Sequence, residues 1–153
     1  MSVTGDKGGG CQMTKYWIGV ASRDHVRTGA AGGFCQLGHG KAAPLRRLKA
    51  GDRIIYYSPR ERMGDGAAVQ AFTGIGEVAA GEPEPHDMGG GFVPYRRSFT
   101  FYKASDAPIQ PLLPLLSFTR GRAQWAIVLR RGVFAIDRKD YEIIADAMGA
   151  TRR

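Results

Sequence analysis

The residues with the greatest chemical capacity gather in one glycine-rich segment, GGFCQLGHGKAAPLRR, at positions 32–47. Cys35 and His39 bring together a thiol and an imidazole, the combination that enzymes use for nucleophilic catalysis. No asparagine or aspartate that could orient the imidazole stands nearby, and a lone cysteine is commonly a small buried residue. The pattern therefore predicts no catalytic residues.

Other motifs with known chemistry are incomplete. The run GHGKAA ends like a phosphate-binding loop, but Cys35 stands where that motif begins with glycine, and Ala42 replaces the Ser or Thr that holds magnesium. The run GIGEVA is followed by Gly81 and Pro83, too soon for the helix of a dinucleotide site. Four potential ligands lack metal-site spacing: His25, Cys35, His39 and His86. We expect no metal site and no cofactor.

Positive charge is concentrated in the same part of the chain. The 153 residues carry a net charge of +8, and residues 23–62 hold nine Lys or Arg against three acids. Residues 120–131 add four arginines without an acid between them, whereas residues 77–87 hold four acids and no Lys or Arg. We expect one basic side, one acidic side and an anionic partner.

Composition favours one soluble domain. No apolar run is long enough to span a membrane, and Cys11 and Cys35 are too few for a disulfide framework, so a cytoplasmic protein is expected. Residues 1–12 are interpreted as a disordered extension or cloning remnant, and residues 150–153 as a tail. Residues 13–149 are long enough for a single domain with a real core.

Short elements follow one another without regular βαβ alternation. Five segments predict strands: 15–21, 53–58, 69–80, 95–102 and 133–136. Helices are expected at three main places: after Ser22, from Pro44, and between Asp137 and Gly149. This order predicts an α+β fold with a mixed or antiparallel, barrel-like sheet.

Six stretches, in order, closely resemble the EVE domain family: YWIGVASRDHV, GGFCQLGHGKAAPLRRLKAGD, IIYYSP, QAFTGIGEV, FTRGRAQW and DYEIIADAM. The family is similar to the PUA-like superfamily, which includes YTH and ASCH domains. The resemblance implies a PUA-like pseudo-barrel of about five or six strands flanked by short helices. It also implies a cleft between the end of the first strand, the loop after the first helix and the middle strands.

The resemblance further implies a non-catalytic nucleic-acid-binding module that reads a modified base in DNA or RNA. A flipped base needs aromatic surface for stacking and polar groups for its edge. Tyr56 and Tyr57 alternate along one strand, so at most one faces the cleft, and the YTH pattern favours Tyr57 with Ser58. We then expect Tyr57→Ala to abolish base discrimination and leave the fold intact. The ligand-binding candidates are Ser22, Phe34, Cys35, Gln36, His39, Tyr57 and Ser58.

Basic residues near this cleft would hold the phosphates that flank the base. The candidates are Lys41, Arg46, Arg47 and Arg120. Two alternatives stay open: a sensor of a free nucleotide or anionic metabolite, and an enzyme that acts on RNA or a modified nucleotide through Cys35 or His39. A polynucleotide reader loses affinity steeply with salt, whereas a pocket for a free base does so only slightly.

Overall fold

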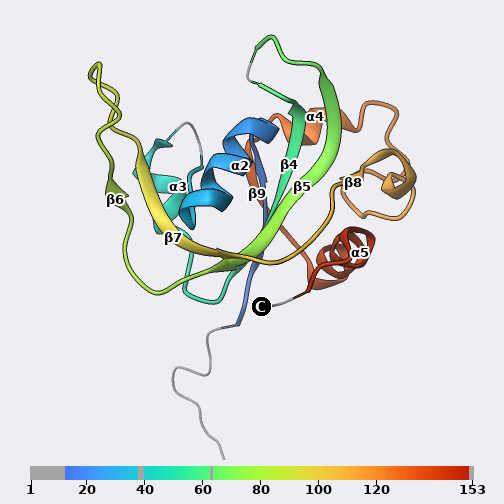
Figure 1. Ribbon diagram of the computed structural model, residues 1–153. Helices are drawn as coiled ribbons and strands as arrows, with labels where there is room; N and C mark the ends of the chain where they lie inside the picture. Colours follow the sequence, from blue (N-terminus) through green and yellow to red (C-terminus); the bar gives the residue numbers. More distant parts are fainter. Residues whose placement is uncertain (1–12, 38–39, 63, 152–153) are drawn as a thin grey trace, which may run out of the picture.

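An eight-stranded sheet organises the molecule, and the computed structural model describes residues 13–37, 40–62 and 64–151. The strands are β2 Tyr16–Val20, β3 Phe34–Cys35, β4 Arg53–Arg60, β5 Ala68–Val78, β6 Glu84–Pro85, β7 Tyr95–Phe101, β8 Ala107–Pro108 and β9 Val133–Ile136. Six of them form the path β3-β7-β5-β4-β2-β9, while β6 pairs with β7 and β8 with β5. The β2–β4 pair is parallel and the other strand pairs are antiparallel. This curled sheet (Figure 1) confirms the expected α+β pseudo-barrel.

The helices are short, and two of them begin at the capping residues that the sequence predicts. They are α2 Arg23–Gly32, α3 Ala42–Arg46, the 3-10 helix η2 Gln110–Leu112, α4 Ala126–Leu129 and α5 Arg138–Met148. Ser22 Oγ accepts a hydrogen bond from the backbone nitrogen of His25 at 3.2 Å, and Asp137 Oδ1 accepts one from that of Asp140 at 2.8 Å. These bonds satisfy amide groups that a helix start leaves unpaired. Within the described ranges, no helix has the length and apolarity needed to cross a membrane.

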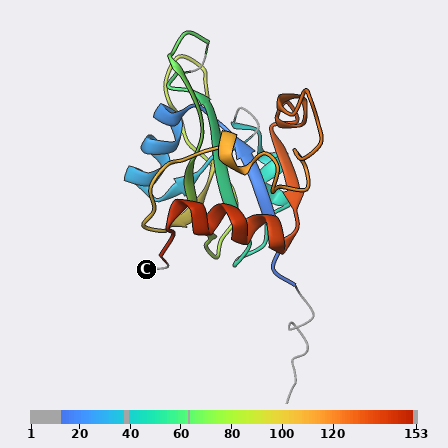
Figure 2. The ribbon, with the colours of Figure 1, turned by 90° about the vertical axis from the view of Figure 1, so that its right-hand side faces the viewer.

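Each face of the sheet carries its own hydrophobic cluster, because side chains alternate along a strand. On β4, Ile55 and Tyr57 belong to one cluster, whereas Ile54 and Tyr56 belong to the other. Helix α5 covers the first cluster (Figure 2), and helices α2 and α3 cover the second on the opposite side (Figure 1). We call these two sides the α5 face and the α2/α3 face.

Several boundaries differ from those that the sequence predicts; strand β5, for example, ends at Val78 instead of residue 80. Strand β4 was expected to end at Ser58, but it continues to Arg60 because a register shift takes Pro59 out of the regular ladder. The loop expected at 81–94 contains the two-residue strand β6. The extension expected over residues 1–12 lies outside the described residues.

Candidate ligand-binding site

A cavity of about 830 Å³ lies at the end of β2, on the α2/α3 face. Its walls come from the β2–α2 junction, the segment from β3 to α3, the turn after β4, the loop that leads into β7, and the turn before β9. Pockets that hold small organic ligands measure roughly 300 to 1,000 Å³. The cavity is therefore large enough for a nucleotide.

Arginine dominates the charge of this cavity. Its lining includes one acid, Asp24, and five arginines: Arg47, Arg62, Arg96, Arg130 and Arg131. Arg62 lies 3.7 Å from the carboxylate of Asp65. The other four have no carboxylate within ion-pair distance among the residues that the structure describes. Their positive charge favours an anionic ligand.

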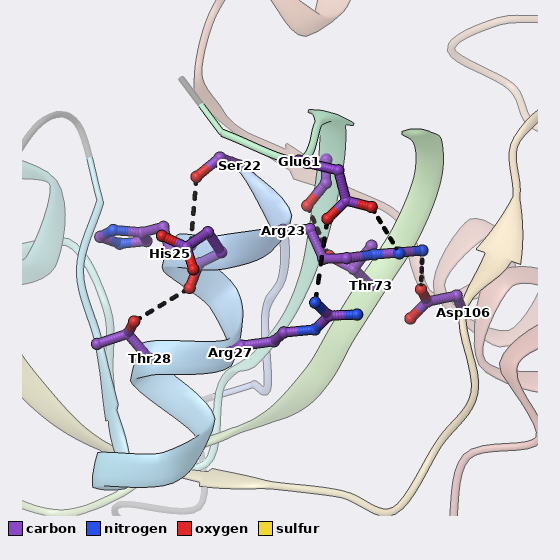
Figure 3. Close-up of polar contacts among 10 residues, drawn as sticks. Ser22, Arg23, His25, Arg27, Thr28, Glu61, Thr73 and Asp106 are labelled. Atoms are coloured by element: carbon purple, nitrogen blue, oxygen red, sulfur yellow. Dashed lines mark hydrogen bonds and ion pairs between the residues drawn. The ribbon is translucent and has the colours of Figure 1, made fainter. Parts of the chain in front are cut away.

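The arginines of α2 differ, because acidic residues neutralise them (Figure 3). Arg23 donates to Glu61 at 2.8 Å and also pairs with Asp106, and Arg27 lies 4.0 Å from Glu61. These contacts tie α2 to the end of β4 and to the segment before β8. Part of the positive charge in residues 23–62 therefore serves the fold. The cavity arginines that have no acidic partner among the described residues are a separate set.

One wall of the cavity combines stacked and hydrogen-bonded side chains from β3 and β7. The guanidinium carbon of Arg96 lies 3.9 Å from the centroid of the Phe34 ring, which places the cation over the ring face. Arg96 Nε donates to Gln36 Oε1 at 3.2 Å, and Nη2 donates to Met88 Sδ at 3.2 Å. The antiparallel pairing of β3 with β7 brings these side chains together, since Phe34 stands opposite Ser98.

The backbone of Gln36 is held from the core by Tyr56. The hydroxyl of Tyr56 accepts from Gln36 N and donates to Gln36 O, each at 3.2 Å. Tyr56 is 1% exposed, and this burial raises its pKa well above the usual value, so the phenol stays neutral. This wall of the cavity therefore has a rigid anchor in the core of the α2/α3 face.

His25 lines the cavity next to the same backbone. Burial lowers its pKa below the usual 6.5, the hydrogen bond to the backbone of Gln36 opposes this shift, and the nearby charge of Arg96 adds to it. The imidazole is therefore neutral at pH 7, where it can donate one hydrogen bond and accept another.

Apolar side chains line the cavity from the loop that leads into β7. Met88 and Phe92 are each 52% exposed. A Cβ atom at Gly40 would lie 2.5 Å from Pro94 Cβ and 3.6 Å from the tip of the Phe92 ring. Gly40 also has a φ of 82°, so glycine is required where this loop meets the segment before α3.

Four residues predicted for the site line the cavity: Ser22, Phe34, Gln36 and Arg47. Ser22 does so while its hydroxyl caps α2. The guanidinium carbon of Arg47 lies 5.0 Å from the ring centroid of Trp17, a core residue. Ser22, Phe34 and Gln36 thus lie where the family resemblance implies a cleft, between the end of β2 and the segment after α2.

Cys35, also predicted for the site, lies in the core instead. It is 1% exposed and belongs to the cluster of the α2/α3 face. Its side chain points opposite to its neighbours Phe34 and Gln36, because side chains alternate on extended backbone. Burial raises the pKa of the Cys35 thiol to about 12, against the opposing effect of Arg97. We therefore remove Cys35 from the expected site.

Tyr57 and Ser58 are corrected in the same way. Tyr57 is 3% exposed in the cluster of the α5 face, where its ring meets that of Phe72 edge to face at a centroid distance of 5.6 Å. Ser58 is fully buried, and its Oγ lies 2.7 Å from Thr73 Oγ1. The alternation of the two tyrosines was predicted correctly, but Tyr56 is the one directed toward the site.

The remaining predicted residues do not line the cavity or lie outside the described residues. Lys41, Arg46 and Arg120 are exposed on the surface and do not belong to the lining. His39 lies outside the described residues. In the part of the chain that the structure describes, no three His, Cys, Asp or Glu side chains converge as metal ligands.

Sequence reasoning missed the second half of the site, which comes from distant segments. Arg96 reaches Phe34 through the β3–β7 pairing, and Met88 and Phe92 belong to a loop that the sequence marks mainly by its acids. The one available signal was the basic run at 120–131, from which only Arg120 was chosen. Arg130 and Arg131 are the members that reach the cavity.

Comparison with known proteins identifies relatives over most of the chain. The model of a family described as EVE domain matches residues 15–147. UPF0310 protein msl3206 of Mesorhizobium japonicum is 51% identical over 142 residues, which cover 92% of this chain and 95% of that protein. UPF0310 protein YdcG of Bacillus subtilis is 45% identical over 89% of this chain and 93% of its own length.

A solved structure shares the fold. The crystal structure of protein Atu2648 from Agrobacterium tumefaciens matches with a TM-score of 0.54 at 15% identity, over 89% of this chain and 94% of that one. At this identity, the likeness concerns the fold alone.

Proposed function

The chain belongs to the EVE domain family, and we propose on this premise that it is a non-catalytic nucleic-acid-binding module that reads one modified base. The base enters the cavity at the end of β2. The modified base that we propose is a methylated or oxidised one. It lies in a single-stranded or locally opened nucleic acid, because a base can leave its stack in these states.

The charge of the cavity carries this proposal. Arg47, Arg96, Arg130 and Arg131 have no ion-pair partners among the described residues, and they surround a space of about 830 Å³. Phosphates that flank an inserted base are the anions that such a ring of arginines would hold, while the apolar lining takes the planar ring. The arginines of α2, which already have acidic partners, take no part.

The environment of the thiol supports binding without catalysis. Nucleophilic cysteines react as thiolates and lie in accessible, electropositive surroundings. Cys35 is buried, and its pKa of about 12 keeps it protonated at neutral pH. An activated thiol is therefore not available on the wall of this cavity.

A binding screen tests the proposal. Short single strands of DNA and RNA, identical except for one methylated or oxidised base, are titrated against the protein at several salt concentrations. We expect one modified base to raise the affinity about tenfold over its unmodified form, as one well-matched contact would, and the affinity of every strand to fall steeply with salt.

Three outcomes would contradict the proposal in whole or in part. Equal affinity for all modified and unmodified strands would remove base reading, and affinity for a free nucleotide without salt-dependent binding of strands would favour a small-molecule sensor. Chemical change of a strand during incubation, measured by mass spectrometry, would remove the non-catalytic assignment.

A further inference from the structure

The wall formed by Arg96 and Gln36 has a defined arrangement of hydrogen-bond donors. Arginine can only donate, so the atom of the Gln36 amide that faces Arg96 Nε must be the oxygen, Oε1, at 3.2 Å. This contact fixes the orientation of the side-chain amide, with Oε1 toward Arg96 and Nε2 away from it. The amide nitrogen Nε2 of Gln36 then has no partner among the described residues, and the same holds for Nη1 of Arg96.

The Arg96 guanidinium also supplies the flat surface of this wall. Its central carbon lies 3.9 Å from the Phe34 centroid, so one face of the aromatic ring is covered by the cation. Bases stack on guanidinium planes as well as on aromatic rings. A base that enters along this side of Phe34 therefore meets the outer surface of Arg96.

We propose that Arg96 orients the Gln36 amide so that this wall offers only donors, and that the site thereby selects a base edge with adjacent acceptors. Such edges are O6 and N7 of guanine, or O2 and N3 of cytosine. Adenine, with a donor next to an acceptor, matches less well. This inference rests on the proposed function. It assigns Gln36 as the residue that contacts the base edge, and Arg96 as the residue that orients the Gln36 amide and offers its outer surface to the base.

The wall is preorganised for this task. Tyr56 holds the backbone of Gln36 at both its nitrogen and its oxygen, and Arg96 holds the end of the side chain. Arg96 is itself fixed by its stack on Phe34 and its contact with Met88. A donor that does not need to be ordered on binding contributes more to discrimination.

The test replaces the donor with an acceptor of the same shape. Gln36→Glu keeps an oxygen toward Arg96 and puts a second oxygen where Nε2 stood. Single strands that differ only in one central guanine, cytosine or adenine are titrated against both proteins at one salt concentration. The readout is the ratio of affinities between bases, because the added charge weakens every strand alike.

We expect the wild-type protein to favour guanine or cytosine over adenine by about tenfold, through donors that meet their adjacent acceptors, and Gln36→Glu to lose this preference. Gln36→Met, which has no amide and no added charge, should also abolish the preference. Arg96→Lys releases the amide and should bring the ratio close to one, whereas Arg138→Lys, the same change at an exposed site on α5, should leave the ratio unchanged.

The two proposals fail in distinguishable ways. If salt-dependent binding persists but the order of bases is the same in all variants, Arg96 and Gln36 do not read the base, and the proposed function stands. If the wild-type protein binds none of the strands, both proposals are overturned.

Discussion

The two faces of the sheet differ in what their buried residues do. On the α5 face, helix α5 closes a hydrophobic cluster that contains Tyr57. On the α2/α3 face, the cluster ends at an arginine-lined cavity. Tyr56 belongs to this cluster, and its hydroxyl forms hydrogen bonds with the backbone of Gln36. Adjacent tyrosines of one strand thus pack in a hydrophobic cluster on one face and support the lining of the cavity on the other. Where a side chain points therefore decides its role more than its residue type does.

The largest expected effect is a loss of stability on the α5 face. Tyr57→Ala leaves a cavity in the cluster of the α5 face and should lower the free energy of unfolding by about 3 to 5 kcal/mol, as for other large aromatic deletions. Denaturant unfolding measures this loss. A fully stable Tyr57→Ala protein that had lost only base discrimination would reverse the comparison and restore the role expected from the sequence.

The next largest expected effect is a loss of strand binding on the α2/α3 face. Replacing both Arg130 and Arg131 with alanine should weaken binding of every single strand about tenfold near physiological salt and reduce the salt dependence by about two phosphate contacts. Fluorescence anisotropy at several salt concentrations measures both quantities. Arg138→Ala on α5 is the control. An equal loss in that control would show that the two faces do not differ in strand binding.

A smaller change sharpens the contrast between the two tyrosines. Tyr56→Phe removes the hydroxyl that Gln36 uses and should lower the free energy of unfolding by about 1 to 2 kcal/mol while also reducing base discrimination. The described residues offer no hydrogen-bond partner to the hydroxyl of Tyr57, so Tyr57→Phe should change neither quantity by a comparable amount. Equal effects of the two substitutions would contradict the distinction.

The smallest effect concerns pH. Burial raises the pKa of Cys35 from 9.0 to about 12, so the folded protein keeps a proton that the unfolded chain releases above pH 9. The stability that this thiol contributes is complete below pH 9 and is lost as the pH rises toward 12. Unfolding of the wild-type protein and Cys35→Ala along this range should show a shrinking difference. A constant difference would mean that Cys35 ionises in the folded protein as it does in the unfolded chain.

Local patterns predict most of the fold. Strand alternation, the caps at Ser22 and Asp137 and the turn residues place the main helices and strands within a few residues, because each depends on neighbours in the chain. The expectation that Ser22, Phe34 and Gln36 lie at a cleft came from the family resemblance, and these three residues line the cavity. The alternation that separates Tyr56 from Tyr57 also separates Cys35 from Phe34, although the predicted site included both.

The rest of the site depends on tertiary contacts that local patterns do not encode. Arg96 meets Phe34 only through strand pairing, and Arg130 and Arg131 reach the cavity only because β9 pairs with β2. Local sequence patterns do not show which charged residues form ion pairs in the fold. Arg23 counts as available charge in the sequence, but Glu61 and Asp106 neutralise it in the fold.

An NMR titration of isotope-labelled protein with a short single strand tests the difference between the two faces most directly. Chemical shift changes should appear at Gln36, Arg96 and the turn that carries Arg131, while Ile144 and Met148 of α5 stay unchanged. Changes centred on α5, or none at the cavity at saturating strand concentration, would contradict the assignment of the α2/α3 face as the binding surface.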